Sequence, residues 1–363
     1  MRSTVFALSL AWACCGGLHL AHADEPERLS NGPFSAPDDA VADDDAGFAG
    51  LNDDIPWYEE FVTPRHWFDV PAYGFYGQAD ALWLARAHNV ERPLVLQAPT
   101  DAAVLSAQDA SLTGRYDLGG LFTVGFQLDK VAATEFTFFG LQDWSSSATV
   151  IDPTSNLHLA GTLSPFTNDF AGADQMTITY SSRVYNAEAN YKQTIEGLTL
   201  LTGFRWFNVS EQFDLNSHSA LFNESSDYRV TAHNNLVGWQ WGAGYNCQLS
   251  RLNLGVLGKI GVFANIASNT ALLRDFGNTQ VDRDYRATTT PLSVLGEIQA
   301  NATYWVTNSV AIRVGYRLIG VNNLALGPSQ LDLTGPAVGR PPFIYAHDYL
   351  ILHGVNAGLE IRF

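Results

Sequence analysis

The sequence predicts an all-β fold, namely a transmembrane antiparallel up-and-down β-barrel of about ten strands, with twelve as the alternative count. Apolar and polar residues alternate over long stretches, which places successive side chains on opposite faces of a strand. The expected connections alternate between short and long, as periplasmic turns and extracellular loops do in outer-membrane barrels. No stretch reaches the ~18 uninterrupted apolar residues of a spanning helix.

The first 23 residues have the features of a secretory signal peptide. Arg2 supplies the positive charge, residues 5–15 the apolar stretch, and residues 21–23 the small-residue cleavage site. The apolar stretch is too short to span a bilayer as a helix. Cleavage leaves Cys247 as the single cysteine, so the exported protein has no internal disulfide to rely on.

Residues 24–73 are predicted to form an acidic, largely disordered periplasmic segment. Ten carboxylates and only one basic residue, Arg28, fall between positions 24 and 56. Such a composition cannot bury enough apolar area to offset the entropy of ordering. The run of aspartates at 43–45 lacks the ligand spacing of an EF-hand, so we predict no metal site there.

The overall composition argues against two classes of protein. Of 363 residues, 46% are hydrophobic and 12% aromatic, whereas 16% are charged, which is unlike a disordered chain. Twenty Lys and Arg face 37 Asp and Glu, giving a formal charge of −17. That balance argues against nucleic acid as a partner, because phosphate binding depends on basic residues.

The barrel is predicted to span residues 74–363. The last strand shows the alternation most clearly, since Val355, Ala357, Leu359, Ile361 and Phe363 share one face. The ten predicted strands lie near 74–86, 118–129, 133–144, 174–192, 196–213, 228–247, 251–266, 289–306, 309–321 and 347–363. Many reach the ~9–11 residues that a tilted strand needs to cross a bilayer.

The predicted connections support a barrel over a secreted β-sandwich, whose connections need not alternate in length. The short turns are expected at 130–132, 193–195, 248–250 and 307–308. The long loops are expected at 87–117, 145–173, 214–227, 267–288 and 322–346. This arrangement places the acidic segment and the C-terminus on the periplasmic side.

In a barrel the apolar face of each strand meets lipid and the polar face lines the lumen. Phe136, Phe138, Phe204 and Trp206 are therefore expected to point outward. The inward parity holds Glu135, Asp143, Glu188 and Arg362, together with seven candidates for a lumen constriction: Arg205, Glu211, Lys259, Glu297, Arg313, Arg317 and Glu360.

Two interpretations of these lumen charges stay open. The arginines could form a constriction that selects anions. Alternatively, charges of both signs could pair into a salt-bridged plug. A ten-stranded barrel is near the size at which side chains fill the interior.

The C-terminal residue Phe363 and the alternate apolar residues before it, from Val355 onward, resemble the signal by which the barrel-assembly machinery recognises bacterial outer-membrane barrels. We therefore expect that machinery and outer-membrane lipid as partners, with a homo-oligomer as a further option.

The chain also resembles the seventh of the outer-membrane β-barrel porin families that are defined by predicted architecture. The stretches that carry the resemblance are ADALWL (79–84), LLTGFRW (200–206), GE (296–297), VGYR (314–317), LALGPSQ (324–330) and HGVNAGLE (353–360). Together they extend over about residues 74–363. The GPS run at 327–329 departs from the family's Ala-Pro pattern. The resemblance implies a barrel in the bacterial outer membrane, and it implies neither catalytic residues nor a defined solute.

The function expected from the sequence is a porin-like channel for passive passage of small solutes or ions. One alternative is a structural or adhesive barrel with a salt-bridged, closed lumen. A second is an outer-membrane enzyme with an active site at the rim, for which the candidates are His88, His158, His218, His233 and the adjacent pair His347 and Asp348. Because no nucleophile elbow, metalloprotease helix or phosphate loop is present, we predict no catalytic residue, cofactor or metal.

Overall fold

The computed structural model describes residues 74–88, 90–161, 170–275, 277, 279–334 and 342–363. The chain divides into two units, 1–66 and 67–363, and only the second contains described residues. The predicted signal peptide and the acidic segment 24–73 lie outside the described residues and stay predictions.

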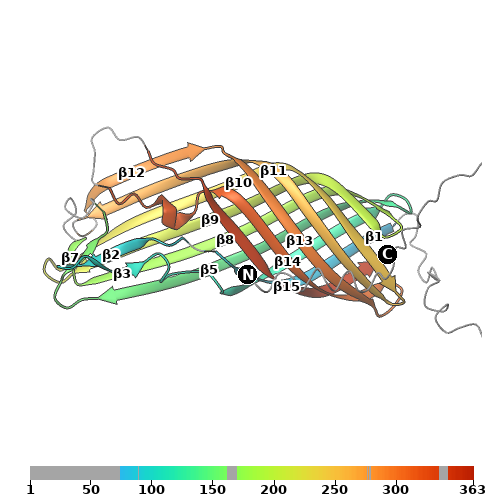
Figure 1. Ribbon diagram of the computed structural model, residues 1–363, viewed down its shortest axis with the longest axis horizontal. Coiled ribbons are helices and arrows are strands. Elements are labelled where there is room, and N and C mark those ends of the chain that lie inside the picture. Colours follow the sequence, from blue (N-terminus) through green and yellow to red (C-terminus); the bar gives the residue numbers. More distant parts are fainter. Residues whose placement is uncertain (1–73, 89, 162–169, 276, 278, 335–341) are drawn as a thin grey trace, which may run out of the picture. The chain divides into compact units, whose positions relative to one another are not determined.

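A single antiparallel sheet closes on itself to form the barrel (Figure 1). It has 11 strands, of which β12 pairs only with β11, so that ten strands close the ring. In order around the ring these are β1 (Gly74–Arg86), β4 (Tyr116–Gln127), β5 (Ala132–Ile151), β8 (Gln175–Ile195), β9 (Leu198–Ser219), β10 (Glu224–Leu249), β11 (Leu252–Asp275), β13 (Leu292–Trp305), β14 (Val310–Leu324) and β15 (Asp348–Arg362). Strand β15 pairs with β1 and completes the circle. The predicted all-β barrel of ten strands is confirmed.

Strand β12 (Gln280–Thr289) continues the line of β13 along the same neighbour. The C-terminal part of β11, residues 267–275, pairs with β12, and its N-terminal part, residues 252–264, pairs with β13. The two strands are separated at Pro291, which has no N–H to donate to the ladder. The Pro291 carbonyl still accepts a hydrogen bond from the Asn265 N–H at 2.9 Å.

The connections at one end of the barrel are short, and we call this the turn end. One of the two-residue turns is Glu196-Gly197 between β8 and β9, where both residues have positive φ, 49° and 86°. Two central residues with positive φ form the hairpin turn whose twist matches that of the flanking strands. Glycine adopts this conformation without steric penalty.

Two connections at the opposite end, the hairpin end, differ from the prediction. The segments 214–227 and 267–288 were expected as loops, but β9 runs to Ser219 and β10 starts at Glu224. Likewise β11 runs to Asp275 and β12 starts at Gln280. Both segments are therefore β-hairpins with tight turns. Their outward residues are polar because they lie beyond the membrane, which removes the apolar contrast that marks a strand in the sequence.

The other three connections at the hairpin end contain short elements. They are β2 (Pro93–Gln97), β3 (Ala102–Ser106), β6 (Leu157–Leu159), β7 (Ala171–Ala173) and the 3-10 turn η3 (Gly327–Gln330). The four strands form a second, small sheet in the order β3-β2-β6-β7. Figure 1 shows this sheet beside the extended strands β5, β8 and β9, away from the turn end.

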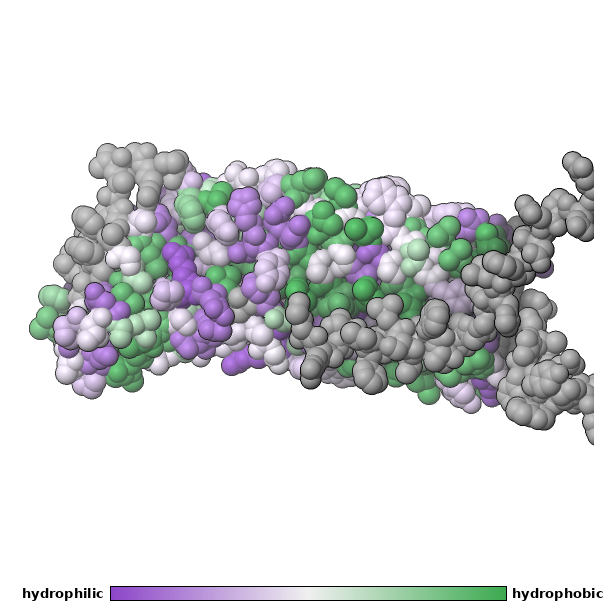
Figure 2. Space-filling model, in the orientation of Figure 1, coloured by the Kyte–Doolittle hydropathy of each residue, from purple (hydrophilic) through white to green (hydrophobic). Residues whose placement is uncertain are grey.

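The outward face of the long strands changes from apolar to polar along its length. On β9, Leu198, Leu200 and Phe204 are exposed near the turn end. Farther along, the outward residues are Ser210, Gln212, Asp214, Asn216 and His218. In Figure 2 hydrophobic side chains gather toward the turn end, and a largely hydrophilic zone separates them from the hairpin end.

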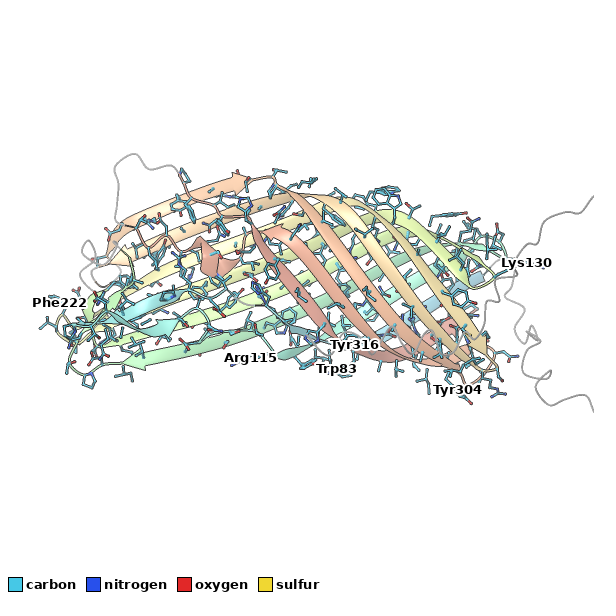
Figure 3. All side chains as sticks on the ribbon, in the orientation of Figure 1. Trp83, Arg115, Lys130, Phe222, Tyr304 and Tyr316 are labelled. Atoms are coloured by element: carbon cyan, nitrogen blue, oxygen red, sulfur yellow. The ribbon has the colours of Figure 1, made fainter. Side chains whose placement is uncertain are left out.

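We call the ring of exposed apolar side chains near the turn end the apolar belt. Phe136 and Phe204 belong to it with 54% and 44% of their surface exposed, as predicted. Exposed apolar area of this extent is typical of contact with lipid. In Figure 3, Lys130 lies at the turn end and Phe222 at the tip of the hairpin end, with Trp83 and Tyr316 on the wall between them. None of the described helical segments has the length and apolar character needed to cross a membrane.

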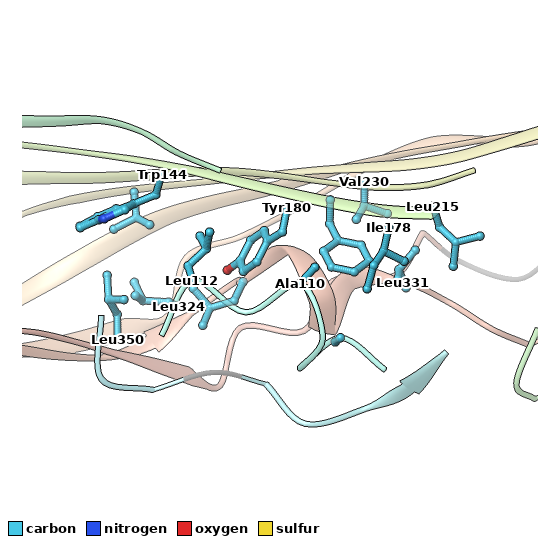
Figure 4. Close-up of a cluster of buried hydrophobic side chains, with 14 of the residues drawn as sticks. Ala110, Leu112, Trp144, Ile178, Tyr180, Leu215, Val230, Leu324, Leu331 and Leu350 are labelled. Atoms are coloured by element: carbon cyan, nitrogen blue, oxygen red, sulfur yellow. The ribbon is translucent and has the colours of Figure 1, made fainter. Parts of the chain in front are cut away.

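The interior has two zones. At the level of the apolar belt it is polar and charged, as described below. Beyond the belt, toward the hairpin end, it is an apolar core in which Tyr180, Leu112, Leu324 and Leu350 lie in one buried cluster (Figure 4). This core fills the space between the extended strands and the connections that cover them.

Candidate functional site: the charged lumen and its inserted loop

Five charged side chains from different strands meet inside the barrel at the level of the belt. The lumen network, as we call it, comprises Glu188 on β8, Arg205 on β9, Lys259 on β11, Glu297 on β13 and Arg317 on β14. The side chains of Arg205, Glu188 and Glu297 have no exposed surface, and those of Lys259 and Arg317 are 6% exposed. The charged groups of the network are therefore shielded from solvent inside the barrel.

The strand register explains how these residues come together. Glu188 lies directly opposite Arg205, and Lys259 lies directly opposite Glu297. Opposite charges at such cross-strand positions attract each other. Gly203 provides space beside this cluster, because a Cβ there would lie 2.4 Å from the side-chain oxygen of Asn190.

Glu297 is the centre of the network. Its carboxylate accepts from Arg205 Nη1 at 2.7 Å and from Arg317 Nη1 at 2.6 Å. The Gln299 amide also donates to it, and Lys259 Nζ lies 4.0 Å away. Two arginines thus hold one buried carboxylate: Arg317 reaches it from the neighbouring strand β14, and Arg205 reaches it from β9, which is not a neighbour of β13 in the sheet.

Glu188 has a separate set of donors. Lys259 Nζ lies 2.8 Å from its carboxylate, and the Gln240 amide lies 2.7 Å away. Asn186 and Asn190 donate to it at 3.1 and 3.0 Å. Both carboxylate oxygens are satisfied, as a buried charge requires.

The lumen network holds three cations and two carboxylates, so it carries one net positive charge. In a low-dielectric interior each of these charges is stabilised by its partners rather than by water. Removing one partner leaves another charge buried and unpaired.

Arg313 and Glu360 lie nearer the turn end and outside the lumen network. Arg313 Nη1 is 3.9 Å from Glu360 Oε2, while Gln78 donates to Glu360 at 3.1 Å and Arg362 lies 3.0 Å from it. Lys192 and Glu135 form a further ion pair at 2.6 Å.

Glu211 lies apart from the other predicted residues, on the hairpin side of the lumen network. Its carboxylate contacts Arg86 Nη1 at 2.6 Å, the Tyr180 hydroxyl at 2.7 Å and the Gly327 N–H at 2.8 Å. We call Arg86, Tyr180, Glu211 and Asp348 the mouth cluster, because they lie where the β14–β15 connection enters the barrel. The side chains of Arg86 and Glu211 are 1% and 0% exposed.

Residues 325–334 of the β14–β15 connection, the inserted loop, are held inside the barrel through their backbone. The Tyr228 hydroxyl accepts from the Asp332 N–H at 3.0 Å, and Arg92 Nη1 donates to the Leu331 carbonyl at 2.6 Å. Arg283 donates to the Thr334 carbonyl at 3.0 Å. Anchors on β10, on β12 and in the β1–β4 connection therefore hold one loop at the mouth.

The seven predicted lumen residues thus fall into three places. Arg205, Lys259, Glu297 and Arg317 meet in the lumen network, Arg313 and Glu360 lie together nearer the turn end, and Glu211 belongs to the mouth cluster. The side chain of Asp143, also expected in the lumen, lies outside what the structure describes.

Sequence reasoning missed Arg86 and Tyr180, and it named Asp348 only beside His347 as a candidate for a rim enzyme. Arg86 continues the inward series Asp80, Leu82 and Leu84 of β1, so its parity could have indicated a lumen position. Tyr180 shares the inward parity of Glu188 within the strand expected at 174–192, and Asp348 lies at the start of the strand expected at 347–363, but parity alone does not identify partners. Their positions depend on the inserted loop.

The C-terminal residues that resemble an assembly signal lie on the outward face of β15. Val355 and Leu359 are 47% and 48% exposed, and Phe363 follows the strand with 78% of its surface exposed. Ala357 and Ile361 share this face. The role of these residues as a recognition signal stays a prediction.

The candidate rim histidines are dispersed. His158 pairs with Asp101 at 3.0 Å, and His218 pairs with Asp174 at 2.9 Å. Within the described part of the chain, no three or more His, Cys, Asp or Glu residues are grouped as metal ligands.

The remaining candidates are also spread over the hairpin side of the barrel. His233 Nδ1 lies 2.8 Å from the Ser210 hydroxyl, His88 stacks on Tyr349, and the rings of His347 and Tyr345 are in contact. Cys247 is a partly buried thiol near the turn end of β10.

No protein-family model and no curated protein matches the sequence. Among solved structures, the outer-membrane protease OmpT of Escherichia coli is 10% identical, with a TM-score of 0.41 over 80% of this chain and 97% of that one. Neisserial surface protein A is 11% identical, with a TM-score of 0.23 over 80% and 97%. The toluene transporter TodX of Pseudomonas putida is 10% identical, with a TM-score of 0.27 over 80% and 89%.

These values are too low to transfer an activity from any of the three proteins. The barrel that the porin resemblance implies is established by the strand pairing itself.

Proposed function

We propose that this chain is a bacterial outer-membrane β-barrel with a closed lumen, which acts through its extracellular part rather than as an open pore. The observation that carries this proposal is the lumen network. A path for solute would have to pass Arg205, Glu188 and Glu297, whose side chains have no exposed surface. The inserted loop covers the same lumen at the mouth.

The orientation follows from the two ends of the barrel. Short turns of outer-membrane barrels face the periplasm and long connections face outward. The turn end is then periplasmic, and the hairpin end is extracellular. The expected signal peptide and the terminal Phe363 support export and insertion by the barrel-assembly machinery.

The ion pairs of the network favour a stable closed state. Separating Arg205 from Glu297 would leave two charges in a low-dielectric interior, and breaking a buried pair by removing one partner typically costs ~3–5 kcal/mol. Thermal fluctuation alone therefore opens this lumen rarely.

The extracellular part has the features of a presentation scaffold. Its strands extend well beyond the belt, it has an apolar core of its own, and a second sheet covers one side. At the tip of the β9–β10 hairpin, Leu221 and Phe222 are 75% and 50% exposed. Exposed apolar side chains on a rigid support favour a structural or adhesive role.

A porin-like channel is the second candidate. The belt-level interior is lined by charged and amide side chains rather than by an apolar core, and a water-filled path would suit such a lining. The surplus cation of the lumen network would favour anions once the path opened.

A rim enzyme has less support. Ser210 and His233 form a serine–histidine hydrogen bond, but their row on the outer wall continues to Arg183 and Ser268. An activated nucleophile needs its base to be oriented by a third group, usually a carboxylate.

Single-channel conductance of the refolded mature barrel in a planar bilayer tests the proposal. We expect a silent wild type and discrete conductance steps after one or two of the interior arginines are removed, as in Arg205→Ala or the double variant Arg313→Ala, Arg317→Ala. Arg362→Ala is the matched control, because its side chain is 35% exposed at the turn end. Wild-type steps whose ion selectivity changes in the double variant would overturn the closed-lumen proposal and establish the channel.

A further inference from the structure

The outer wall of the barrel has a groove within the apolar belt, on strands β10, β11, β13, β14 and β15. Its volume is about 730 Å³, and its surface is almost wholly apolar. Trp241, Ile260 and Ile298 border it with 51%, 58% and 55% of their surface exposed. Lys259 and Glu297 also line it, but their side chains point the other way, into the lumen network. The groove therefore opens toward the lipid.

The strand register forms this groove. Gly296 lies directly opposite Gly320 on the neighbouring strand, and both belong to the outward face. A Cβ at either position would meet no atom within 4 Å, so the space above the two glycines is open. The same row continues to Ile260 and Trp241 on one side and to Ile351 on the other. Two small residues between bulky ones thus give the groove a floor and two ends.

The groove is continuous with the apolar belt and crosses it obliquely. On β15 the row lies at Ile351, and Tyr349 is the single outward residue of that strand on its hairpin side. On β10 the row lies at Trp241, and the belt continues through Trp239 and Val237 toward the hairpin end. The tilt of these strands explains the difference (Figure 1). From β15 to β10 the groove therefore runs from the hairpin-side edge of the belt toward the turn end.

The length of the groove suits one hydrocarbon chain. From β15 to β10 its row crosses four strand-to-strand spacings of ~4.8 Å, which gives about 19 Å. The hydrocarbon of one leaflet is about 15 Å thick, because the whole core measures ~30 Å. An oblique groove of this length therefore covers much of one leaflet.

The β15 end of the groove has a polar cluster beside it. Leu318, which lines the groove, lies directly opposite His353, whose Nδ1 is 2.9 Å from the Tyr316 hydroxyl. The ring of Tyr116 meets the ring of His353 edge-on, with 6.3 Å between the centroids. Tyr116 and Tyr316 are 60% and 46% exposed on the outer wall. Phenol and imidazole groups near the edge of the belt can hydrogen-bond to the polar part of a lipid.

We propose that the groove binds one acyl chain of a membrane lipid, whose headgroup region hydrogen-bonds to Tyr116, Tyr316 and His353. Lipid is the favoured occupant because the groove is continuous with the belt, which is the lipid-facing surface of the barrel. The direction also agrees. The polar cluster lies at the hairpin-side end, and the chain runs from there toward the middle of the membrane, as in the leaflet on that side. The site is on the outer wall, so it holds whether the lumen is closed or open.

Lipid binding to the refolded mature barrel in detergent micelles tests the site. Phosphatidylethanolamine with palmitoyl chains is titrated, and the lipid-bound fraction is measured by native mass spectrometry. We expect one tightly bound lipid per wild-type barrel. The double variant Gly296→Leu, Gly320→Leu fills the floor of the groove. It should lower the affinity by a factor on the order of 10–100, because several methylene groups of the chain lose their burial.

Gly77→Leu is the matched control for the floor variants. Gly77 is also an outward residue of the belt, and a Cβ there would have its nearest contact at 4.0 Å, with the Thr123 carbonyl oxygen. It lies outside the groove, so this variant should bind lipid as the wild type does. Tyr316→Phe combined with His353→Leu removes the polar cluster and should lower the affinity several-fold.

The heat-dependent electrophoretic mobility of each variant reports whether its barrel has closed. If the double variant does not fold, Gly320→Ala takes its place, and its single added methyl group should still reduce binding several-fold. A wild type that binds no lipid would overturn the proposal, as would a folded floor variant that binds as tightly as the wild type. Recovery of the wild type as lipid-free dimers would also overturn it, because the groove would then be occupied by a second copy of the chain.

Discussion

Arg205 and Glu297 form an ion pair of 2.7 Å across the lumen, between strands β9 and β13 that are not neighbours in the sheet. Neither side chain has exposed surface. The pair therefore connects two strands of the barrel through its interior.

Removing one member of this pair should destabilise the barrel. In Glu297→Ala, Arg205 and Arg317 lose their shared carboxylate, and we expect a loss of ~3–5 kcal/mol in the free energy of unfolding. Guanidinium unfolding of the refolded barrel, followed by tryptophan fluorescence, measures it. Arg362→Ala at the turn end should change stability by less than ~1 kcal/mol. Equal effects of the two variants would contradict a central role for the pair.

The seam between β15 and β1 should not tolerate a side chain at Gly358. A Cβ there would lie 2.1 Å from the Ala79 carbonyl oxygen and 2.4 Å from Asp80 Oδ1, and the backbone oxygen cannot move away without breaking the ladder. We expect Gly358→Val to fail to close the barrel. The shift in electrophoretic mobility of folded barrels on heating reports closure. The adjacent outward Ala357→Val should fold normally, and efficient folding of Gly358→Val would refute the steric argument.

Charge on the outward face should be tolerated according to position along β9. Phe204 lies in the apolar belt, so Phe204→Arg is expected to cost ~2–4 kcal/mol in a bilayer. Gln212 points outward beyond the belt, and Gln212→Arg should have little effect. Urea unfolding in lipid vesicles compares the two. A large loss for Gln212→Arg would show that the belt extends farther than its apolar side chains indicate.

The start of the β9–β10 turn, at Ala220, should become less stable at acidic pH. Burial opposes ionisation of Asp174, but hydrogen bonds from the His218 ring at 2.9 Å and the Ala220 N–H at 2.7 Å hold the pKa of Asp174 below its usual value. A carboxyl group whose pKa is lowered by folding stabilises the fold at pH values above its usual pKa. This stabilisation is lost as the pH falls through the lowered pKa.

Hydrogen exchange near Ala220 should therefore rise at acidic pH in the wild type. In Asp174→Asn it should be fast at all pH values, because the charged acceptor is absent. An Asn variant as protected as the wild type at neutral pH would exclude this role for the carboxylate.

Much of the barrel could be predicted because a strand that crosses a membrane has an unambiguous period of two. The first predicted strand, 74–86, coincides with β1 (Gly74–Arg86), and the last, 347–363, differs from β15 (Asp348–Arg362) by one residue at each end. Parity likewise places Arg205 and Glu297 inside, because Phe204 and Ile298 beside them are apolar. Beyond the belt this contrast fades, which is why the hairpins at 214–227 and 267–288 were expected as loops.

The sequence by itself determined the strand count, the inward and outward faces and the end of the barrel that carries the long connections, because these depend on local alternation and on connection length. Only the tertiary structure decided which charges meet. Arg205 pairs with Glu297 inside the barrel, although the two are 92 residues apart in the sequence. Glu211 contacts Arg86 and the Gly327 N–H rather than the other lumen charges. These contacts depend on closure of the ring and on the path of one loop through its mouth, and neither is recorded in the residues on either side of a strand.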